Sequence, residues 1–440
     1  MLYHTWTFGL FFALGYSVFL LIRNTRLRVP WLLVLSYVFY AFACPWYLVL
    51  LLCATTVDYL AVLGMARTGW KRSFLAAAIV LNLGLLAFFK YAHFFSDILL
   101  PVGLSFFIFQ SMTYSIDFYR GQVAEEPSFL RYAAFVSLFP QLLAGPIERA
   151  RNILPQLRQP ARITWQDAAD GLSLFVVGLF KKVALADYLA LYVNKVYDAP
   201  DAQNASALVV ASAVFAWQIY FDFSGYTDMA RGVARALGIR LMLNFDNPYL
   251  ATGLGDFWRR WHISLSTWFR DYLYIPLGGN RHGELRTYVN MALTMVVSGL
   301  WHGATWTFGL WGALHALYRV FTRRLESSPF YTQRVPKFVK RLWVFALVTV
   351  AWIFFRAGSF GDACIIVRRI FSSGDWGDPG CPVLVLVLVG SVWLYQIVYQ
   401  SRWEGLLRLA PVRLALVVLM LLYLVLMRPT ETRQFIYFQF

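Results

Sequence analysis

Long apolar runs are the feature that most limits how this chain can fold. A helix needs about 20 apolar residues to cross the hydrocarbon core of a bilayer. Runs approaching or reaching this length lie near residues 6–22, 29–44, 46–65, 74–89, 342–355, 382–400 and 411–427. Because backbone polar groups must be satisfied internally in lipid, such runs fold as helices. The sequence therefore predicts an all-α, multi-pass membrane protein.

The positive charge of the chain follows the same pattern. Of the 440 residues, 59% are hydrophobic and 14% charged, whereas soluble domains are about 25% charged. The net charge of +16 is also typical of nucleic-acid binders. However, Lys and Arg gather in short segments between apolar runs, as the positive-inside rule describes. We name 23–28, 67–72, 149–158 and 319–341 the four basic loops, predict that they are cytoplasmic, and expect no nucleic-acid binding.

Neither a soluble domain nor an internal repeat interrupts this pattern. Residues 1–440 are therefore expected to form a single integral-membrane domain. The four cysteines, Cys44, Cys53, Cys364 and Cys381, show neither a CxxC motif nor metal-ligand spacing. We expect neither a disulfide framework nor a metal site.

Three segments are too polar, or too rich in helix breakers, for a lipid-facing span. Residues 101–120 place Ser, Thr, Gln and Asp among aromatic residues, which favours a helix that lines an interior cavity. The alternative is a helix whose hydroxyls bond its own backbone. Residues 139–157 contain three prolines and Gly145, which predicts a broken or re-entrant segment. Residues 256–276 mix Arg and Asp with Trp and Tyr, as expected of protein-lined structure that enters the membrane.

Ionisable residues also lie between residues 180 and 243. The lysine pair 181–182 is interpreted as snorkelling to the headgroups or as part of an ion pair. Asp222 and Asp228 are interpreted as buried carboxylates paired with a buried Arg, with a catalytic role as the alternative. Ser224–Gly225 is expected to break the helix between them. Residues 231–243 are expected to form an amphipathic helix in the membrane interface.

His302 is the sharpest candidate for a functional residue. An ionisable side chain inside a membrane is costly unless it has a partner or a function. Trp301 and Trp306 flank His302, and Gly299 and Gly303 have the small-xxx-small spacing that lets a second helix approach closely. We therefore expect His302 to be enclosed by protein rather than exposed to lipid.

A second histidine, His262, lies in the aromatic segment 256–276. On the residues alone, either histidine can be a packed, hydrogen-bonded side chain without a catalytic role. A metal site shared by His262 and His302 is a further alternative, but no third ligand is evident.

Several blocks of the sequence resemble the membrane-bound O-acyltransferase family, and more narrowly its alginate O-acetyltransferase branch. The blocks, which run from about residue 100 onwards, are PVGLSFFIFQSMTYSIDFYRG, FPQLLAGPI, DFSGYTDMA, FWRRWHISLSTWFRDYLYIPLGGN, SGLWHGATWTFGLWGALH, WIFFRA and FIYFQF. The resemblance implies about 11 transmembrane helices, with re-entrant and interfacial helices, around a central funnel. It also implies a multi-pass protein of the bacterial inner membrane.

The resemblance further implies which residues act. His302 corresponds to the family's catalytic histidine, and His262 to its second histidine. The expected acyl donor is acetyl-CoA, a substrate, and no permanently bound cofactor is expected. Its phosphates need cations, for which Arg259, Arg260 and Arg281 are candidates, although each is also explained as an ordinary positive-inside residue. The expected partners are membrane lipids, a periplasmic protein that accepts the acetyl group or transfers it onward, and a polysaccharide such as alginate as final acceptor.

The residue types suit acyl transfer from a thioester to a hydroxyl. A neutral imidazole can take the hydroxyl proton near pH 7, and burial keeps His302 neutral. Trp301 and Trp306 are expected to exclude water. Arg259, Arg260 and Asp271 are expected to favour the charged form of His262. The alternatives are acyl transfer to a lipid or another glycan, such as cellulose or peptidoglycan, and a transporter or flippase, for which the repeated halves are not seen.

Overall fold

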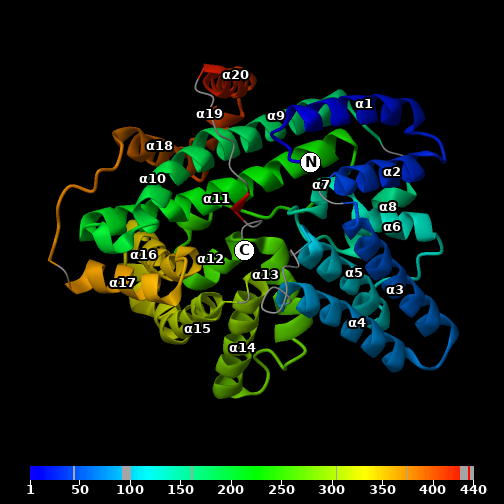
Figure 1. Cartoon of the computed structure of the whole chain (residues 1–440), viewed down its shortest axis with the longest axis horizontal. Coiled ribbons are helices and arrows are strands. Elements are labelled where there is room, and N and C mark those ends of the chain that lie inside the picture. Colours follow the sequence, from blue (N-terminus) through cyan, green and yellow to red (C-terminus); the bar gives the residue numbers. More distant parts are fainter. Residues whose placement is uncertain are drawn as a thin grey trace. The chain divides into compact units, whose positions relative to one another are not determined.

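The computed structural model describes residues 1–42, 45–91, 101–159, 162–303, 305–372, 374–426 and 435–436. Cys44 lies outside these ranges. The regular elements in the described ranges are all helices (Figure 1). The prediction of an all-α chain is therefore confirmed for the part of the sequence that the structure describes.

The chain divides into two compact units, which are described separately. Unit 1 comprises residues 1–179 and 226–242, and unit 2 comprises residues 180–225 and 243–440. The prediction of a single integral-membrane domain over 1–440 stays a prediction.

The helices of unit 1 come mainly from the first part of the chain. They are α1 (Trp6–Ile22), α2 (Arg28–Ala41), α3 (Tyr47–Arg67), α4 (Lys71–Tyr91), α5 (Leu104–Tyr119), α6 (Phe129–Ser137), α7 (Phe139–Leu142), α8 (Ala150–Arg158), α9 (Trp165–Phe180) and the end of α11 (Ala205–Ala236).

Unit 2 holds the remaining helices, including short 3-10 and π turns. They are η2 (Lys181–Ala186), α10 (Asp187–Tyr197), η3 (Pro200–Ala202), most of α11, η4 (Pro248–Leu250), α12 (Leu254–Arg260), α13 (Ile263–Phe269), η5 (Arg270–Tyr274), α14 (Gly283–His302), α15 (Trp306–Ser327), η6 (Phe330–Arg334), α16 (Lys337–Arg356), α17 (Phe360–Ser372), α18 (Val383–Tyr399), α19 (Glu404–Arg408) and α20 (Ala410–Leu426).

Four of these helices, α3, α4, α11 and α16, are long and apolar enough to cross a membrane. The shorter helices α1, α2, α18 and α20 are also apolar. Except for α11, which was not predicted as a span, these helices correspond to the runs from which the sequence predicted membrane spans, with boundaries shifted by a few residues. The number of 11 spans and the central funnel stay predictions.

Helix α5 confirms in part the interpretation that hydroxyls of residues 101–120 bond their own backbone, whereas the interior cavity stays a prediction. The hydroxyl of Ser111 donates to Asp58 Oδ2 of α3 at 2.6 Å, and Gln110 Nε2 donates to the carbonyl oxygen of Phe135 at 2.6 Å. The hydroxyl of Thr113 instead bonds its own helix, at the carbonyl oxygen of Gln110. Polar side chains on α5 therefore join it to neighbouring helices of unit 1 as well as to its own backbone.

The breakers in 139–157 have the predicted effect around Gly145 and Pro146, but α8 continues through Pro155. Helix α7 is four residues long, and the chain is not helical again until Ala150. Prolines cannot continue a helix without losing a hydrogen bond, which explains the interruption. Whether this segment is re-entrant stays a prediction.

Two predictions for the region around α11 are wrong. The helix continues through Ser224–Gly225, because one glycine costs a helix only about 1 kcal/mol and most of α11 is buried. Residues 231–243 do not form an interfacial helix, since α11 ends at Ala236 and Gly238 follows with φ 74°. Arg235 pairs with Asp170 of α9 at 2.7 Å rather than facing headgroups.

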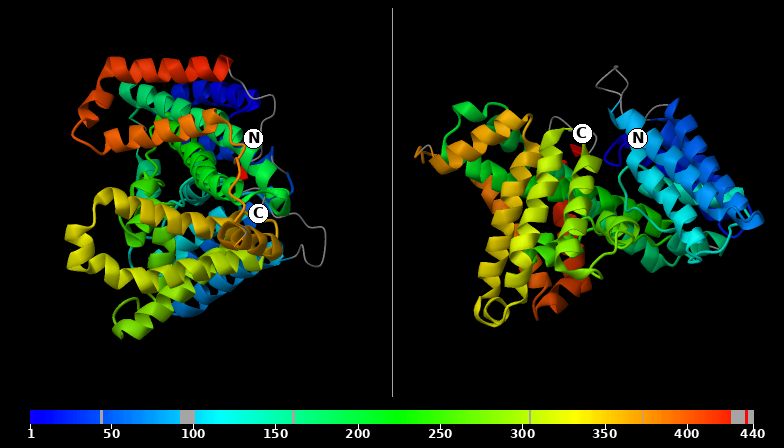
Figure 2. Two further views of the ribbon diagram at one scale, coloured as in Figure 1. Left: turned by 90° about the vertical axis from the view of Figure 1, so that its left-hand side faces the viewer. Right: turned by 90° about the horizontal axis from the view of Figure 1, so that it is seen from below.

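In unit 2, the helices α14, α15 and α16 lie side by side (Figure 2). Helix α14 ends at His302, and α15 starts four residues later. The two short helices α12 and α13 meet at His262. Both candidate histidines therefore lie at helix ends within one compact unit.

Candidate active site

Small residues bring α14 and α15 into backbone contact next to His302. A side chain at Gly299 would overlap the carbonyl oxygen of Phe308, and one at Gly312 would overlap the carbonyl oxygen of Met295. The close helix approach that the sequence predicted at Gly299 is thus confirmed. It places the end of α14 against the start of α15.

Aromatic rings enclose His302, which is 8% exposed. Its ring centroid is 4.9 Å from that of Trp301, 5.3 Å from that of Trp311 and 5.2 Å from that of Phe355 on α16. The expected enclosure by protein is confirmed. The expected role of Trp306 is wrong, because Trp306 is 85% exposed and begins α15 on its outer face. Trp311 and Phe355, which the sequence analysis missed, take its place.

His262 has an unusual backbone conformation. Its φ of 41° and ψ of 54° lie in the left-handed region, which costs a non-glycine residue roughly 1–2 kcal/mol. Asn244 compensates for this strain: its backbone oxygen accepts from Ile263 N at 2.9 Å, and its side-chain oxygen accepts from Ser264 N at 3.2 Å and from Ser264 Oγ at 2.9 Å. Asn244 is fully buried and lies in the non-helical segment after α11.

The same oxygen of Asn244 determines the tautomer of His262. Ser264 N is a donor only, so the atom that faces it must be the carbonyl oxygen Oδ1 of the amide. His262 Nδ1 lies 3.1 Å from this acceptor and therefore carries the proton. Since His262 is 1% exposed, burial lowers its pKa to about 3. The ring is neutral, with its lone pair on Nε2.

The prediction that His262 is charged is therefore wrong. The charges expected to act on it are each engaged in an ion pair; on α12 this is because residues three and four apart share one face of the helix. Asp256 lies 3.5 Å from Arg259 and 3.0 Å from Arg260, and Arg270 donates to Asp271 at 2.8 Å. Proximity along the sequence did not indicate which charges face the imidazole.

One indole connects the two histidines. The ring centroid of Trp301 is 6.3 Å from that of His262 and 4.9 Å from that of His302, with both contacts close to edge-to-face. The structure thus brings together two histidines that are 40 positions apart in the sequence. Both rings are largely shielded from solvent, since His262 is 1% exposed and His302 is 8% exposed.

The three candidate arginines differ in how far they are engaged. Arg259 is 73% exposed, and Arg281 is exposed in the loop that precedes α14. Arg260 is half-buried and pairs with Asp256 and, at 3.6 Å, with Asp246. Arg259 and Arg281 are therefore better placed than Arg260 to bind phosphate.

Both carboxylates have the expected structural pairing, but Asp222 has a different partner and Asp228 is only partly buried. Asp222 pairs with Lys182 at 2.7 Å, rather than with an arginine. Asp228, in unit 1, pairs with Arg231 at 3.4 Å. The interpretation of the lysine pair as an ion-pair member is confirmed at Lys182.

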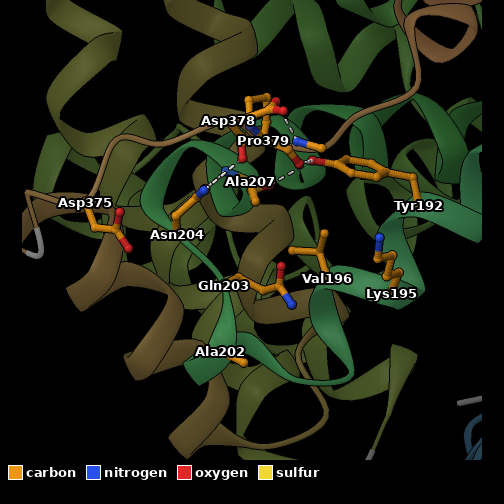
Figure 3. Close-up of a pocket in the computed structure, with 11 residues that line it drawn as sticks. Tyr192, Lys195, Val196, Ala202, Gln203, Asn204, Ala207, Asp375, Asp378 and Pro379 are labelled. Atoms are coloured by element: carbon orange, nitrogen blue, oxygen red, sulfur yellow. Dashed lines mark hydrogen bonds between the residues drawn. The ribbon is translucent and has the colours of Figure 1, made fainter.

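A separate cavity of about 340 Å³ lies in unit 2 between α10, the start of α11 and the loop before α18 (Figure 3). Asn204 donates to the carbonyl oxygen of Asp378 at 2.8 Å, and Tyr192 donates to that of Pro379 at 2.9 Å. Neither His262 nor His302 lines it. Its polar groups hold the loop in place, so we assign the cavity no role in catalysis.

Residues 118–357 match the model of the membrane-bound O-acyltransferase family. This range contains both histidines and the three candidate arginines.

Individual relatives cover more of the chain. The probable alginate O-acetylase AlgI of Azotobacter vinelandii is 41% identical over 376 residues, which is 80% of this chain and 74% of the relative. The corresponding protein of Pseudomonas aeruginosa is 38% identical, over 81% of this chain and 72% of the relative. A peptidoglycan O-acetyltransferase of Helicobacter pylori is 35% identical, over 79% and 74%. The chain therefore belongs to the membrane-bound O-acyltransferase family and is an O-acyltransferase.

Proposed function

We propose that this protein moves an acetyl group from cytoplasmic acetyl-CoA toward a hydroxyl of an exported polysaccharide. The observation that carries this proposal is the pair of buried histidines around Trp301, in a chain of this enzyme family. The relatives named alginate O-acetylase and peptidoglycan O-acetyltransferase support an acetyl group and a glycan acceptor. Alginate is the preferred acceptor class, and peptidoglycan is the second candidate.

In the proposed reaction, His302 is the general base. The acceptor hydroxyl oxygen attacks the thioester carbonyl carbon as His302 takes the hydroxyl proton. The carbon–sulfur bond then breaks, and the departing sulfur takes the proton from His302, which gives the free thiol of coenzyme A and restores the neutral base. The surrounding rings of Trp301, Trp311 and Phe355 keep out water that would hydrolyse the thioester.

His262 has a different role in this proposal. Its neutral ring presents the lone pair of Nε2, which accepts a hydrogen bond from an N–H or O–H group of a substrate. His262 thus positions a substrate, while His302 accepts the proton. On the cytoplasmic side, the exposed Arg259 and Arg281 contact the phosphates of coenzyme A.

Because both histidines are buried, the kind of acceptor molecule that can reach them is restricted. A polymer cannot bring its hydroxyls next to rings that are almost fully enclosed, unless a passage leads to them. We therefore include a periplasmic partner protein that receives the acetyl group and passes it to the polysaccharide. The proposal also includes a position in the bacterial inner membrane, with about 11 spans around a central funnel.

Measuring the release of free thiol tests whether acetyl-CoA is the acyl donor. The protein, purified in detergent, is expected to release coenzyme A thiol slowly from acetyl-CoA, and faster when an acceptor or partner is supplied. His302→Gln, prepared in parallel, is the control for contaminating thioesterases. Release from palmitoyl-CoA but not from acetyl-CoA would instead favour acylation of a lipid. No release from either donor, together with saturable solute transport in vesicles, would overturn the proposal.

A further inference from the structure

A short segment near the end of the sequence is buried inside unit 2. Phe435 is 1% exposed and Ile436 is 4% exposed. The backbone N–H of Ile436 donates to Asp222 Oδ2 at 2.7 Å, which places the segment beside α11, as the short red piece in Figure 1 shows. The sequence analysis included this region only as the block FIYFQF, one of those that carry the family resemblance.

The segment is held by a buried ionic cluster that contains one lysine and two aspartates. Lys182 Nζ lies 2.8 Å from Asp187 Oδ1 and 2.7 Å from Asp222 Oδ1, and all three side chains are almost fully buried. One ammonium faces two carboxylates, so these three groups carry an excess negative charge. Buried carboxylates need additional donors, and the N–H of Ile436 is one. The cluster thus favours a donor at this position of the backbone.

The adjacent residue connects the segment to the candidate active site. The ring centroid of Phe435 is 5.6 Å from that of Phe223, which follows Asp222 on α11. The Phe223 centroid is in turn 4.6 Å from that of His262, at an interplanar angle of 86°. Ile436 is therefore anchored at one residue of α11, while Phe435 packs on the next, whose ring supports the imidazole.

We propose that the Phe435–Ile436 segment, anchored by Asp222, is a positioning element for His262. Asp222 holds the backbone, Phe435 limits the movement of the Phe223 ring, and that ring helps to fix the orientation of His262. Asp222 and Phe435 are thus positioning residues and do not touch substrate. This role rests on the proposed function, because it concerns the orientation of a residue of the acyl-transfer site.

Ile436→Pro tests the anchor directly, because proline has no N–H to donate to Asp222. Ile436→Val keeps the N–H and most of the side chain, and is the matched control. We expect Ile436→Pro to lower kcat for thiol release from acetyl-CoA about 10- to 100-fold, since a misplacement of about 1 Å can have an effect of this size. KM for acetyl-CoA should stay within about twofold, because the arginines that face coenzyme A are not touched. Ile436→Val should keep near wild-type kcat.

A second readout does not depend on activity. Diethyl pyrocarbonate modification, located by peptide mass spectrometry, should rise at His262 in Ile436→Pro and remain unchanged at His302. If the proline variant is not recovered folded, Phe435→Ala, with Phe435→Leu as control, tests the same contact. Equal labelling of both histidines, or unchanged His262 labelling with unchanged kcat, would overturn the positioning role. If the wild-type protein releases no thiol from acetyl-CoA, the proposed donor fails, and the labelling experiment still tests the segment.

Discussion

Asn244→Ala is expected to displace His262 and to destabilise unit 2. The side-chain oxygen of Asn244 lies 3.1 Å from His262 Nδ1, 3.2 Å from Ser264 N and 2.9 Å from Ser264 Oγ. A hydrogen bond contributes roughly 0.5–1.5 kcal/mol net, so three contribute about 3 kcal/mol. Without these hydrogen bonds, less stabilisation offsets the left-handed backbone of His262, which costs roughly 1–2 kcal/mol.

The change should therefore affect both stability and rate. We expect a lower unfolding temperature in detergent, followed by intrinsic tryptophan fluorescence, and a loss of thiol release from acetyl-CoA of at least tenfold. Asn244→Asp keeps an oxygen acceptor and should retain more of both properties. Ser264→Ala removes only the hydroxyl contact and should cost about 1 kcal/mol.

A matched control is available in the same segment. Asn247 also has a left-handed backbone, with φ 45°, but Asn247→Ala does not remove a group that contacts His262. It should lower stability through backbone strain, while kcat changes little. If Asn247→Ala reduces kcat as much as Asn244→Ala does, or if Asn244→Ala stays fully active, then Asn244 does not act by orienting the imidazole.

Two further predictions concern the histidines and the α14–α15 contact. His302→Gln should lose about 10²- to 10⁴-fold in kcat, as is typical for loss of a general base. His262→Gln can still form a hydrogen bond and should retain part of the activity. An equal loss of kcat in the two variants, both folded, would refute the division of roles. Gly312→Ala should destabilise the protein by about 1–3 kcal/mol in thermal unfolding, because the added Cβ would overlap the backbone of α14. Gly309→Ala should be tolerated, because its Cβ would lie 3.7 Å from the nearest atom, Leu300 Cδ2. Equal stability of the two alanine variants would contradict the close approach.

Local pattern was sufficient for much of the fold. The apolar runs predicted the helices α1, α3, α18 and α20 to within a few residues, because the need to satisfy backbone hydrogen bonds in lipid acts on each segment separately. Prolines in 139–157 predicted the interruption after α7 for the same local reason. The glycine spacing at Gly299 predicted that another helix would pack there, and the enclosure of His302 followed from it.

Other features depended on residues that are distant in the sequence. The sequence could not indicate that Trp311 and Phe355, rather than Trp306, pack against His302, since this depends on how α14, α15 and α16 meet. Nor could it indicate that α11 continues through Gly225, because burial of a long helix outweighs the small cost of one glycine.

The protonation state of His262 is the feature for which the prediction from the sequence and the tertiary structure differ most. Neighbouring charges in the sequence predicted an imidazolium, yet Arg259 and Arg260 pair with Asp256, and the imidazole faces Asn244, 18 positions earlier. The residue types at 259–262 determined that a histidine and its charged neighbours would be present. Only the tertiary structure determined that this histidine is neutral, because protonation depends on the atoms that surround a ring in space and on its separation from water.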